Sequence, residues 1–173
     1  MNKMMEVLSG KVATSQSSNV NIISVLEELV KSRQVSGGKP VPKLGCESTS
    51  FFVKADKNQL IAILGHLVQN AQDATGANGK IMISQKRSSG GVVIEIEDTG
   101  TGMSDEFIQS ELFKPFKTTK GTKGMGIGVY EAREIILAIG GQIEVSSTVN
   151  VGTCFKLTIP AAVKATPNKT LSS

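Results

Sequence analysis

Two short stretches of alternating apolar and polar residues, 81–86 and 92–97, follow each other with only a tight turn between them. The two-residue repeat is that of a β-strand with one buried face. Ser88-Ser89-Gly90-Gly91 supplies the small residues of a hairpin turn. Strands joined this closely pair antiparallel, because a parallel pair needs a crossover of a dozen or more residues. The hairpin therefore argues against a doubly wound parallel sheet.

Helices with one apolar face surround this hairpin, and most have a recognisable start or stop signal. They are expected over 20–31 (ended by Ser36-Gly37-Gly38), 57–74 (capped by Asp56), 104–112 and 129–139 (ended by Gly140-Gly141). Strands are expected over 41–44, at an edge because of Pro40 and Pro42, over 50–54, and in a closing hairpin of 142–146 and 153–159. This irregular order predicts an α+β two-layer sandwich, with a mixed, mostly antiparallel sheet of about five strands covered by about three helices.

Composition excludes several classes of function. The 173 residues are 39% hydrophobic and 20% charged, which suits one packed domain. The net charge of +4 suits a phosphate-bearing ligand, but the basic residues are not clustered with aromatic ones, as they are in nucleic-acid-binding proteins. Cys46, Cys154 and the single histidine, His66, lack the spacing of a zinc site, and the cysteines favour a reducing cytosol over a disulfide scaffold. No segment resembles a transmembrane helix or a signal peptide, so a soluble chain is expected.

Two polar residues lie in phase with the apolar face of a predicted strand. Asp98 is the next inward position after Ile94 and Ile96, and Thr153 opens the inward face of 153–159. A buried carboxylate and a buried hydroxyl need partners, so the two residues predict the polar anchors of a pocket. The alternatives stay open: a turn aspartate bonded to its own backbone, and a threonine that is packed and self-bonded.

The helix over 57–74 carries His66, Asn70 and Asp73, four and three residues apart, on one narrow stripe. Three such groups on a mostly apolar helix predict a ligand-facing edge. The alternative is a solvated face, although such a face usually holds more Lys and Glu. The amide oxygen of Asn70 is a hard ligand that suits Mg²⁺ retaining most of its waters.

The segment 112–129 combines lysines with glycines directly before a helix. The lysines are Lys114, Lys117, Lys120 and Lys123, and the glycines are Gly121, Gly124, Gly126 and Gly128. Glycines before a helix expose backbone N–H groups beside the positive end of its dipole. The pattern predicts a polyphosphate cradle, with a mobile solvated loop as the alternative. It is neither a P-loop nor a Rossmann turn, because both fingerprints are incomplete.

Four motifs, taken together and in order, resemble the ATP-binding catalytic domain of sensor histidine kinases, within the superfamily of gyrase, MutL and the heat-shock chaperone ATPases. Residues 64–74 (LGHLVQNAQDA) resemble the N box, 98–103 (DTGTGM) the G1 box, 113–120 (FKPFKTTK) the F box and 124–128 (GMGIG) the G2 box. Each motif alone is weak, whereas four in this order are specific. The resemblance covers about 54–159 and implies the Bergerat-type ATP-binding fold.

The resemblance implies ATP and Mg²⁺ as ligands. Asp98 would accept from the adenine amino group with support from Thr153, and Asn70 would bind the Mg²⁺ that bridges the phosphates. Gly100 and Gly102 would allow the turn beside the base, while Gly124, Gly126 and Gly128 would line the triphosphate under a lid at 114–123. Lys120 of that lid would contact a phosphate. The matching motifs add Asp73, Met103, Thr118, Thr119, Met125 and Ile127 to the nucleotide-binding set.

Two positions depart from the family pattern. His66 stands where many histidine kinases carry Asn and hydrolysing ATPases carry Glu; a catalytic role at the phosphate and a packed, hydrogen-bonded role both stay open. Asp73 stands where many of these kinases carry Lys, so the lid would supply more of the positive charge. The F box is similar to that of the nitrogen-regulation class, and the N and G2 boxes resemble the PrsK-type kinases of exosortase systems.

Three segments are expected: 1–19 as the end of an upstream dimerisation hairpin with a connector, 20–160 as the ATP-binding catalytic domain, and 161–173 as a flexible tail. The acceptor histidine would lie on that hairpin, absent from this chain. We therefore expect a cytoplasmic monomer that transfers the γ-phosphoryl group of ATP to the separate histidine domain. A response-regulator receiver domain is the expected downstream partner. No contact with nucleic acid or membrane is expected. An inner-membrane anchor in the parent protein is left open. The alternatives are a related ATPase or anti-sigma-factor-like serine kinase, and a non-catalytic nucleotide-sensing module.

Overall fold

A five-stranded mixed sheet forms one layer of the protein. The computed structural model describes residues 16–45, 48–115 and 127–163. The strand order is β2-β4-β5-β7-β6, and only β2 and β4 pair in parallel. The strands are β2 (Lys43–Leu44), β4 (Ile81–Ser88), β5 (Gly91–Asp98), β6 (Gln142–Thr148) and β7 (Gly152–Ile159). The predicted sheet is confirmed, with its shortest strand at the edge where two prolines had placed it.

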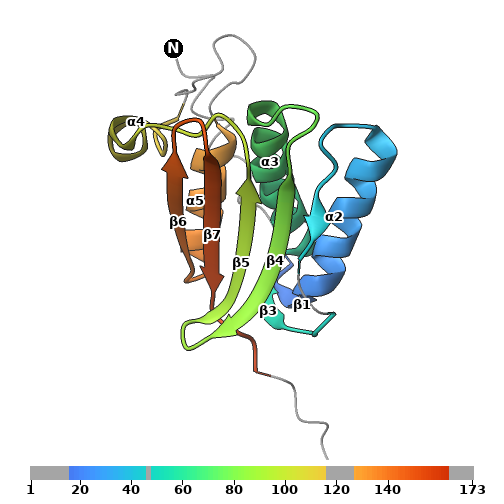
Figure 1. The fold of residues 1–173 in the computed structure, drawn as a ribbon. Coiled ribbons are helices and arrows are strands. Elements are labelled where there is room, and N and C mark those ends of the chain that lie inside the picture. The colour runs from blue at the N-terminus through green and yellow to red at the C-terminus, as the bar shows by residue number, and fades with distance from the viewer. Residues whose placement is uncertain (1–15, 46–47, 116–126, 164–173) are drawn as a thin grey trace, which may run out of the picture.

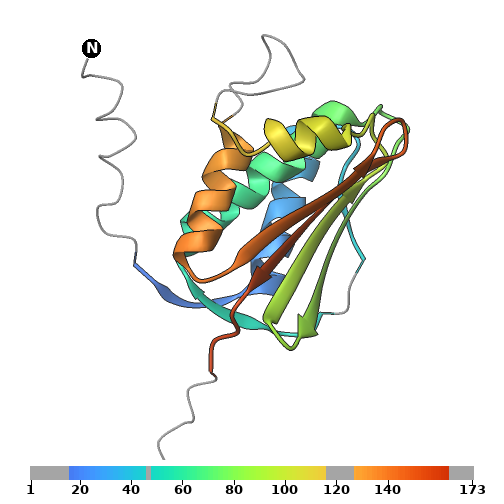
Figure 2. The ribbon, with the colours of Figure 1, turned by 90° about the vertical axis from the view of Figure 1, so that its left-hand side faces the viewer.

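Helices cover one face of this sheet. The covering helices are α2 (Ile22–Ser36), α3 (Lys57–Ala74) and α5 (Gly128–Ala138), and a short helix α4 (Asp105–Ser110) follows β5. Figure 1 looks onto the sheet with these helices behind it, and the turned view in Figure 2 separates the two layers. The expected two-layer sandwich is therefore confirmed. Among the helices described, none has the length and apolarity needed to cross a bilayer.

The N-terminal end of the described chain differs from the prediction. Residues Ser18–Asn21 form a strand, β1, which pairs antiparallel with β3 (Phe52–Ala55) in a separate two-stranded sheet. Helix α2 begins at Ile22 rather than at residue 20, so the predicted helix start was wrong, and Ser18 and Asn19 of the predicted connector belong to this strand. Val20 is buried opposite Val53, a partner 33 positions along the chain that local periodicity does not reveal. At its other end α2 runs to Ser36, because Gly37 closes it with a φ of 72°.

Helix α3 has the boundaries that its sequence predicts. Asp56 accepts a hydrogen bond from the backbone N–H of Gln59 at 3.0 Å, the geometry of an N-cap. The apolar stripe of the helix, which includes Leu60, Leu64 and Leu67, is fully buried over the sheet. Burial of these side chains fixes the rotation of α3. Residues one turn further on, at its C-terminal end, are thereby held above the end of β5.

The chain closes around the C-terminal end of β5. The loop after β5 meets the end of α3, where the Thr101 N–H donates to the carbonyl of Ala74 at 3.0 Å. It also meets the tip of the β6–β7 hairpin, where the Asn150 N–H donates to the carbonyl of Thr101 at 2.7 Å. Three segments distant in sequence therefore converge at one end of the sheet, the upper end in Figure 1.

Candidate functional site

Asp98 lies at this convergence, on the inner face at the end of β5, and is only 5% exposed. Its Oδ1 accepts the backbone N–H of Gly100 at 2.8 Å. Burial raises the pKa of the carboxyl above its ordinary value, and the backbone N–H groups of Gly100 and Thr153 and the nearby Thr75 hydroxyl partly offset that rise. The turn-aspartate alternative thus holds together with the pocket interpretation, because the same carboxylate caps its turn and faces a cavity.

Thr153 lies directly opposite Asp98 in the β5–β7 ladder and is 7% exposed. Its hydroxyl is 2.8 Å from the hydroxyl of Ser147 on β6. Ser147 donates in turn to the carbonyl of Gly152 at 2.9 Å and accepts the N–H of Met103 at 2.8 Å. Thr153 is therefore anchored by the neighbouring strand and not by its own backbone. Ser147 was not predicted, although it continues the inward phase of Ile143 and Val145 as Asp98 does for β5.

Gly100 and Gly102 permit the close approach of the three segments. A Cβ on Gly100 would lie 2.6 Å from the carbonyl oxygen of Ala74. Gly102 has a φ of +66°, and a Cβ there would lie 2.1 Å from the carbonyl oxygen of Thr148. No side chain fits at either position without moving backbone, so the turn after Asp98 requires glycine at both.

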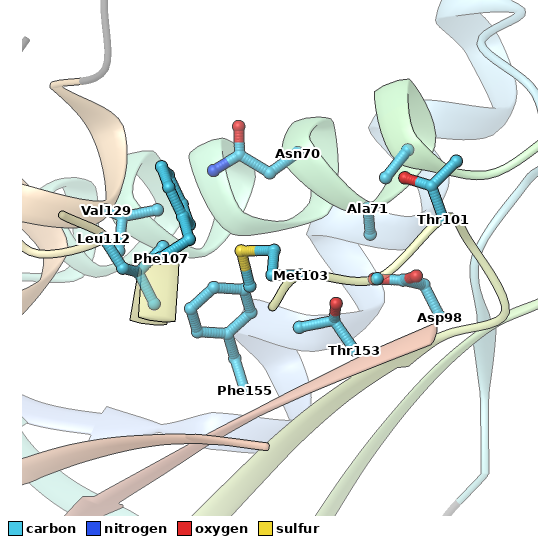
Figure 3. Close-up of a pocket in the computed structure, with 12 residues that line it drawn as sticks. Asn70, Ala71, Asp98, Thr101, Met103, Phe107, Leu112, Val129, Thr153 and Phe155 are labelled. Carbon is cyan, nitrogen blue, oxygen red and sulfur yellow. The ribbon is translucent and has the colours of Figure 1, made fainter. Parts of the chain in front are cut away.

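A cavity lies between α3 and the ends of β5 and β7. Figure 3 shows Asn70 on its helix side and Asp98 and Thr153 on its sheet side. Asn70 is half-buried and is the one member of the predicted helical stripe that lines this cavity. The full lining set is Asn70, Ala71, Ala74, Asp98, Thr101, Gly102, Met103, Phe107, Leu112, Val129, Thr153 and Phe155. The cavity thus combines a few polar groups with an apolar wall, as ligand pockets do.

The other two members of the helical stripe do not line the cavity. Asp73 is exposed and accepts a hydrogen bond from Gln69 Nε2 at 2.8 Å, while Gln69 Oε1 accepts one from Arg33 of α2 at 2.7 Å. Asp73 therefore takes part in a bridge between helices. His66 is exposed, with Nδ1 3.7 Å from Glu131 Oε2 of α5. That pairing leaves both earlier interpretations of His66 open.

Several predicted nucleotide-binding residues lie in 116–126, outside the described residues: Thr118, Thr119, Lys120, Gly124, Met125 and Gly126. The described part of the glycine-rich segment begins with Ile127, the N-cap of α5, followed by Gly128. A Cβ on Gly128 would lie 3.1 Å from Cβ of His66, so the start of α5 packs closely on α3. The start of α5 and the middle of α3 therefore meet at the helix side of the site.

Sequence reasoning missed most of the apolar wall and one buried hydroxyl. Phe107, Leu112 and Phe155 line the cavity, yet in the sequence they are ordinary core residues of their elements. Thr75, just past α3, is 5% exposed, and its hydroxyl oxygen lacks a partner that meets full hydrogen-bond geometry among the described residues. It lies close enough to Asp98 to lower the pKa of that carboxyl. Only the tertiary fold brings Thr75 to Asp98, so no local signal identifies it.

A divalent metal in this site would rely on few protein ligands. Within the part of the chain that the structure describes, no three His, Cys, Asp or Glu side chains lie together as a metal cluster. Asn70 nevertheless presents an amide to the cavity. Mg²⁺ commonly binds through one or two protein oxygens plus phosphates and waters. The residues present fit an Mg²⁺ that arrives with a phosphate ligand, and they do not form a closed protein cage.

Comparison with known proteins agrees with this architecture. The family model described as "Histidine kinase-, DNA gyrase B-, and HSP90-like ATPase" matches residues 55–163. Among curated relatives, the sensor protein FixL of Bradyrhizobium diazoefficiens is 35% identical over 114 residues, 64% of this chain and 22% of FixL. The sensor histidine kinase ZraS of Escherichia coli K12 is 32% identical over 111 residues, 64% of this chain and 23% of ZraS. This chain therefore spans less than a quarter of either relative.

Solved structures show the same fold. The catalytic domain of the histidine kinase ThkA superposes with a TM-score of 0.72 at 30% identity, covering 84% of this chain and 95% of that domain. Full-length ShkA in complex with AMPPNP gives a TM-score of 0.75 at 23% identity, covering 92% of this chain and 34% of ShkA. At that lower identity, the ShkA likeness is one of fold alone.

Proposed function

Because the chain belongs to the family of histidine kinase-, DNA gyrase B- and HSP90-like ATPases, we propose that it is the ATP-binding catalytic domain of a sensor histidine kinase. The observation that carries the proposal is one cavity that is lined by Asn70 from α3 and by the buried pair Asp98 and Thr153. The relative ZraS is a sensor histidine kinase and FixL is a sensor protein, and they support this choice over an ATPase or a serine kinase.

The two sides of the cavity suit the two ends of a nucleotide. Asp98 and Thr153, here called the base end, offer buried oxygens to a purine amino group while Met103 and Phe155 cover its faces. His66, Asn70 and Gly128, here called the phosphate end, lie where α3 meets the start of α5. The N-terminus of α5 favours negative charge. Asn70 would hold Mg²⁺, which neutralises phosphate charge when it is bound.

The proposed reaction transfers the γ-phosphoryl group of ATP to an imidazole nitrogen of a separate dimerisation domain. A nitrogen–phosphorus bond forms, the bond between the γ-phosphorus and the β,γ-bridging oxygen breaks, and ADP leaves. Such transfer depends on positioning and on charge neutralisation more than on covalent help from the protein. A receiver domain of a response regulator would take the phosphoryl group next. We place this chemistry in the cytoplasm, with this chain as a monomer.

The test adds the chain, labelled ATP and Mg²⁺ to a separately prepared dimerisation hairpin that carries its acceptor histidine. We expect acid-labile, base-stable label on the hairpin, as phosphohistidine requires. Asp98→Asn and Asn70→Ala should each abolish most of this label, whereas Asn58→Ala, on an exposed position of the same helix, should not. Acid-stable label would indicate a serine kinase, and ATP binding without any transfer would indicate a nucleotide-sensing module.

A further inference from the structure

The hydroxyl of Ser147 is fully committed to three partners. Its single proton goes to the carbonyl of Gly152, 2.9 Å away, because a carbonyl oxygen only accepts. One of its lone pairs accepts the N–H of Met103 at 2.8 Å. Either hydroxyl could donate across the 2.8 Å contact with Thr153. If the Ser147 proton goes to Gly152, Thr153 must be the donor and Ser147 the acceptor.

This direction determines what Thr153 offers to a ligand. With its only proton directed at Ser147, the Thr153 hydroxyl presents lone pairs to the cavity that it lines. Asp98 beside it is a carboxylate, which also accepts, and its Oδ1 already takes the N–H of Gly100. Thr101 lines the same cavity, but unlike Asp98 and Thr153 it is exposed. The buried polar pair of the base end is thus made of acceptors.

We propose that Ser147 is a positioning residue that sets base specificity, because it makes the base end of the pocket accept only and so excludes 6-oxopurine nucleotides. This inference rests on the proposed nucleotide-binding function. An adenine amino group donates to both acceptors, whereas hypoxanthine places a carbonyl oxygen at the same position and brings acceptor against acceptor. A buried polar group left without a partner weakens binding by roughly 10- to 100-fold.

The test compares the affinities of ATP and ITP, which differ in the group at purine position 6 and in the proton that ITP carries on N1, at a pH well above the raised pKa of Asp98. The wild-type chain should prefer ATP by at least about 10-fold. Ser147→Ala releases the Thr153 hydroxyl to rotate and donate, so this preference should fall about 10-fold. Ser147→Thr keeps the hydroxyl and should keep the preference. Ser146→Ala, on the exposed face of the same strand, is the matched control and should change neither affinity.

The ratio of affinities separates this role from a merely structural one. If Ser147→Ala weakens ATP and ITP by the same factor, the residue only supports the loop and the inference is wrong. Thr153→Val gives an independent test that stays available even if Ser147→Ala fails to fold. This variant removes the acceptor, so its preference for ATP over ITP should be lower than that of wild type. An unchanged preference overturns the inference. A wild-type chain that binds neither nucleotide contradicts the proposed function itself. A wild-type chain that binds both equally contradicts only the specificity.

Discussion

The base end of the cavity is buried, with Asp98 and Thr153 only 5% and 7% exposed, whereas at the phosphate end the side chains of His66 and Glu131 are 48% and 49% exposed. The base-end groups are held by hydrogen bonds of 2.8 Å, whereas His66 of the phosphate end and its neighbour Glu131 approach only to 3.7 Å. A ligand therefore meets a preformed recognition surface at one end and solvated side chains at the other. The difference teaches that, of the two proposed ends, only the base end has its polar groups already held in place.

The comparison predicts its largest effect for Asp98→Asn. The substitution keeps the shape of the side chain but removes the charged acceptor, and should weaken ATP about 100-fold, or about 2.7 kcal/mol. Calorimetric titration measures the loss. An affinity within a few fold of wild type would mean that the base end does not hold the purine.

Asp98→Asn should weaken ATP binding but should favour the stability of the fold as the pH rises. Because burial raises the pKa of Asp98, the folded state binds this proton more tightly than the unfolded state does. The contribution of this carboxyl to the free energy of unfolding is therefore favourable at low pH and declines as pH rises through the folded pKa. Asp98→Asn removes that decline, so its stability relative to wild type should improve from acidic to neutral pH in denaturant titrations. A relative stability that falls over this range would contradict the cause given for the shift.

Gly102→Ala should show how rigid the base end is. The new Cβ would stand 2.1 Å from the Thr148 carbonyl oxygen at a φ of +66°. We expect a loss of about 2 kcal/mol in the free energy of unfolding, because both the positive φ and the contact are unfavourable. Gly76→Ala is the matched control, since nothing lies within 4 Å of its Cβ position, and should stay within about 0.5 kcal/mol of wild type. Equal thermal stability of the two variants would show that the loop adapts freely.

Asn70→Ala should affect binding at the phosphate end and leave binding at the base end unchanged. We expect about a 10-fold loss of ATP affinity, or 1.4 kcal/mol, when Mg²⁺ is present, and none when the metal is chelated. Adenosine, which lacks phosphates, should bind the variant as it binds wild type. A metal-independent loss would place Asn70 with the base-end residues. Asn58→Ala serves as the control on the same helix.

The smallest effect is expected for Thr75→Val. Loss of the buried hydroxyl removes a group that lowers the pKa of Asp98, so that pKa should rise further. ATP affinity should fall about 3-fold at neutral pH, or about 0.6 kcal/mol. Carbon-13 NMR of the Asp98 carboxyl follows the titration directly, and Thr75→Ser should restore wild-type behaviour. If the pKa of Asp98 is the same in Thr75→Val as in wild type, the Thr75 hydroxyl does not act on Asp98.

Much of the fold could be predicted because its signals are local. Helix α3 has a cap at Asp56 and an apolar stripe, and both signals lie within the helix and its cap. The inward phase of a strand likewise placed Asp98 and Thr153 at the cavity without knowledge of their neighbours. Strand β1 was missed because its four residues pair with a distant strand, and its apolar residues also fit a helical repeat.

The parts of the site that the sequence did not predict depend on contacts across the fold. Thr75 has no local pattern, and it acquires its position only when α3 and β5 pack together. Asp73 shares a helical stripe with Asn70, yet Gln69 and Arg33 draw it into a bridge with α2. Ser147 had a usable signal, the inward phase of β6, but it lies one residue beyond the predicted end of that strand. Strand ends are where such polar positions matter and where sequence boundaries are least certain.

The most direct test of the account is a titration of the isotope-labelled chain with adenosine alone, followed by two-dimensional amide NMR without metal. A preformed base end predicts saturable shifts at the amides of Gly100, Gly102, Met103 and Thr153, and their loss in Asp98→Asn. Shifts confined to residues outside the cavity, or none at all at millimolar adenosine, would contradict it.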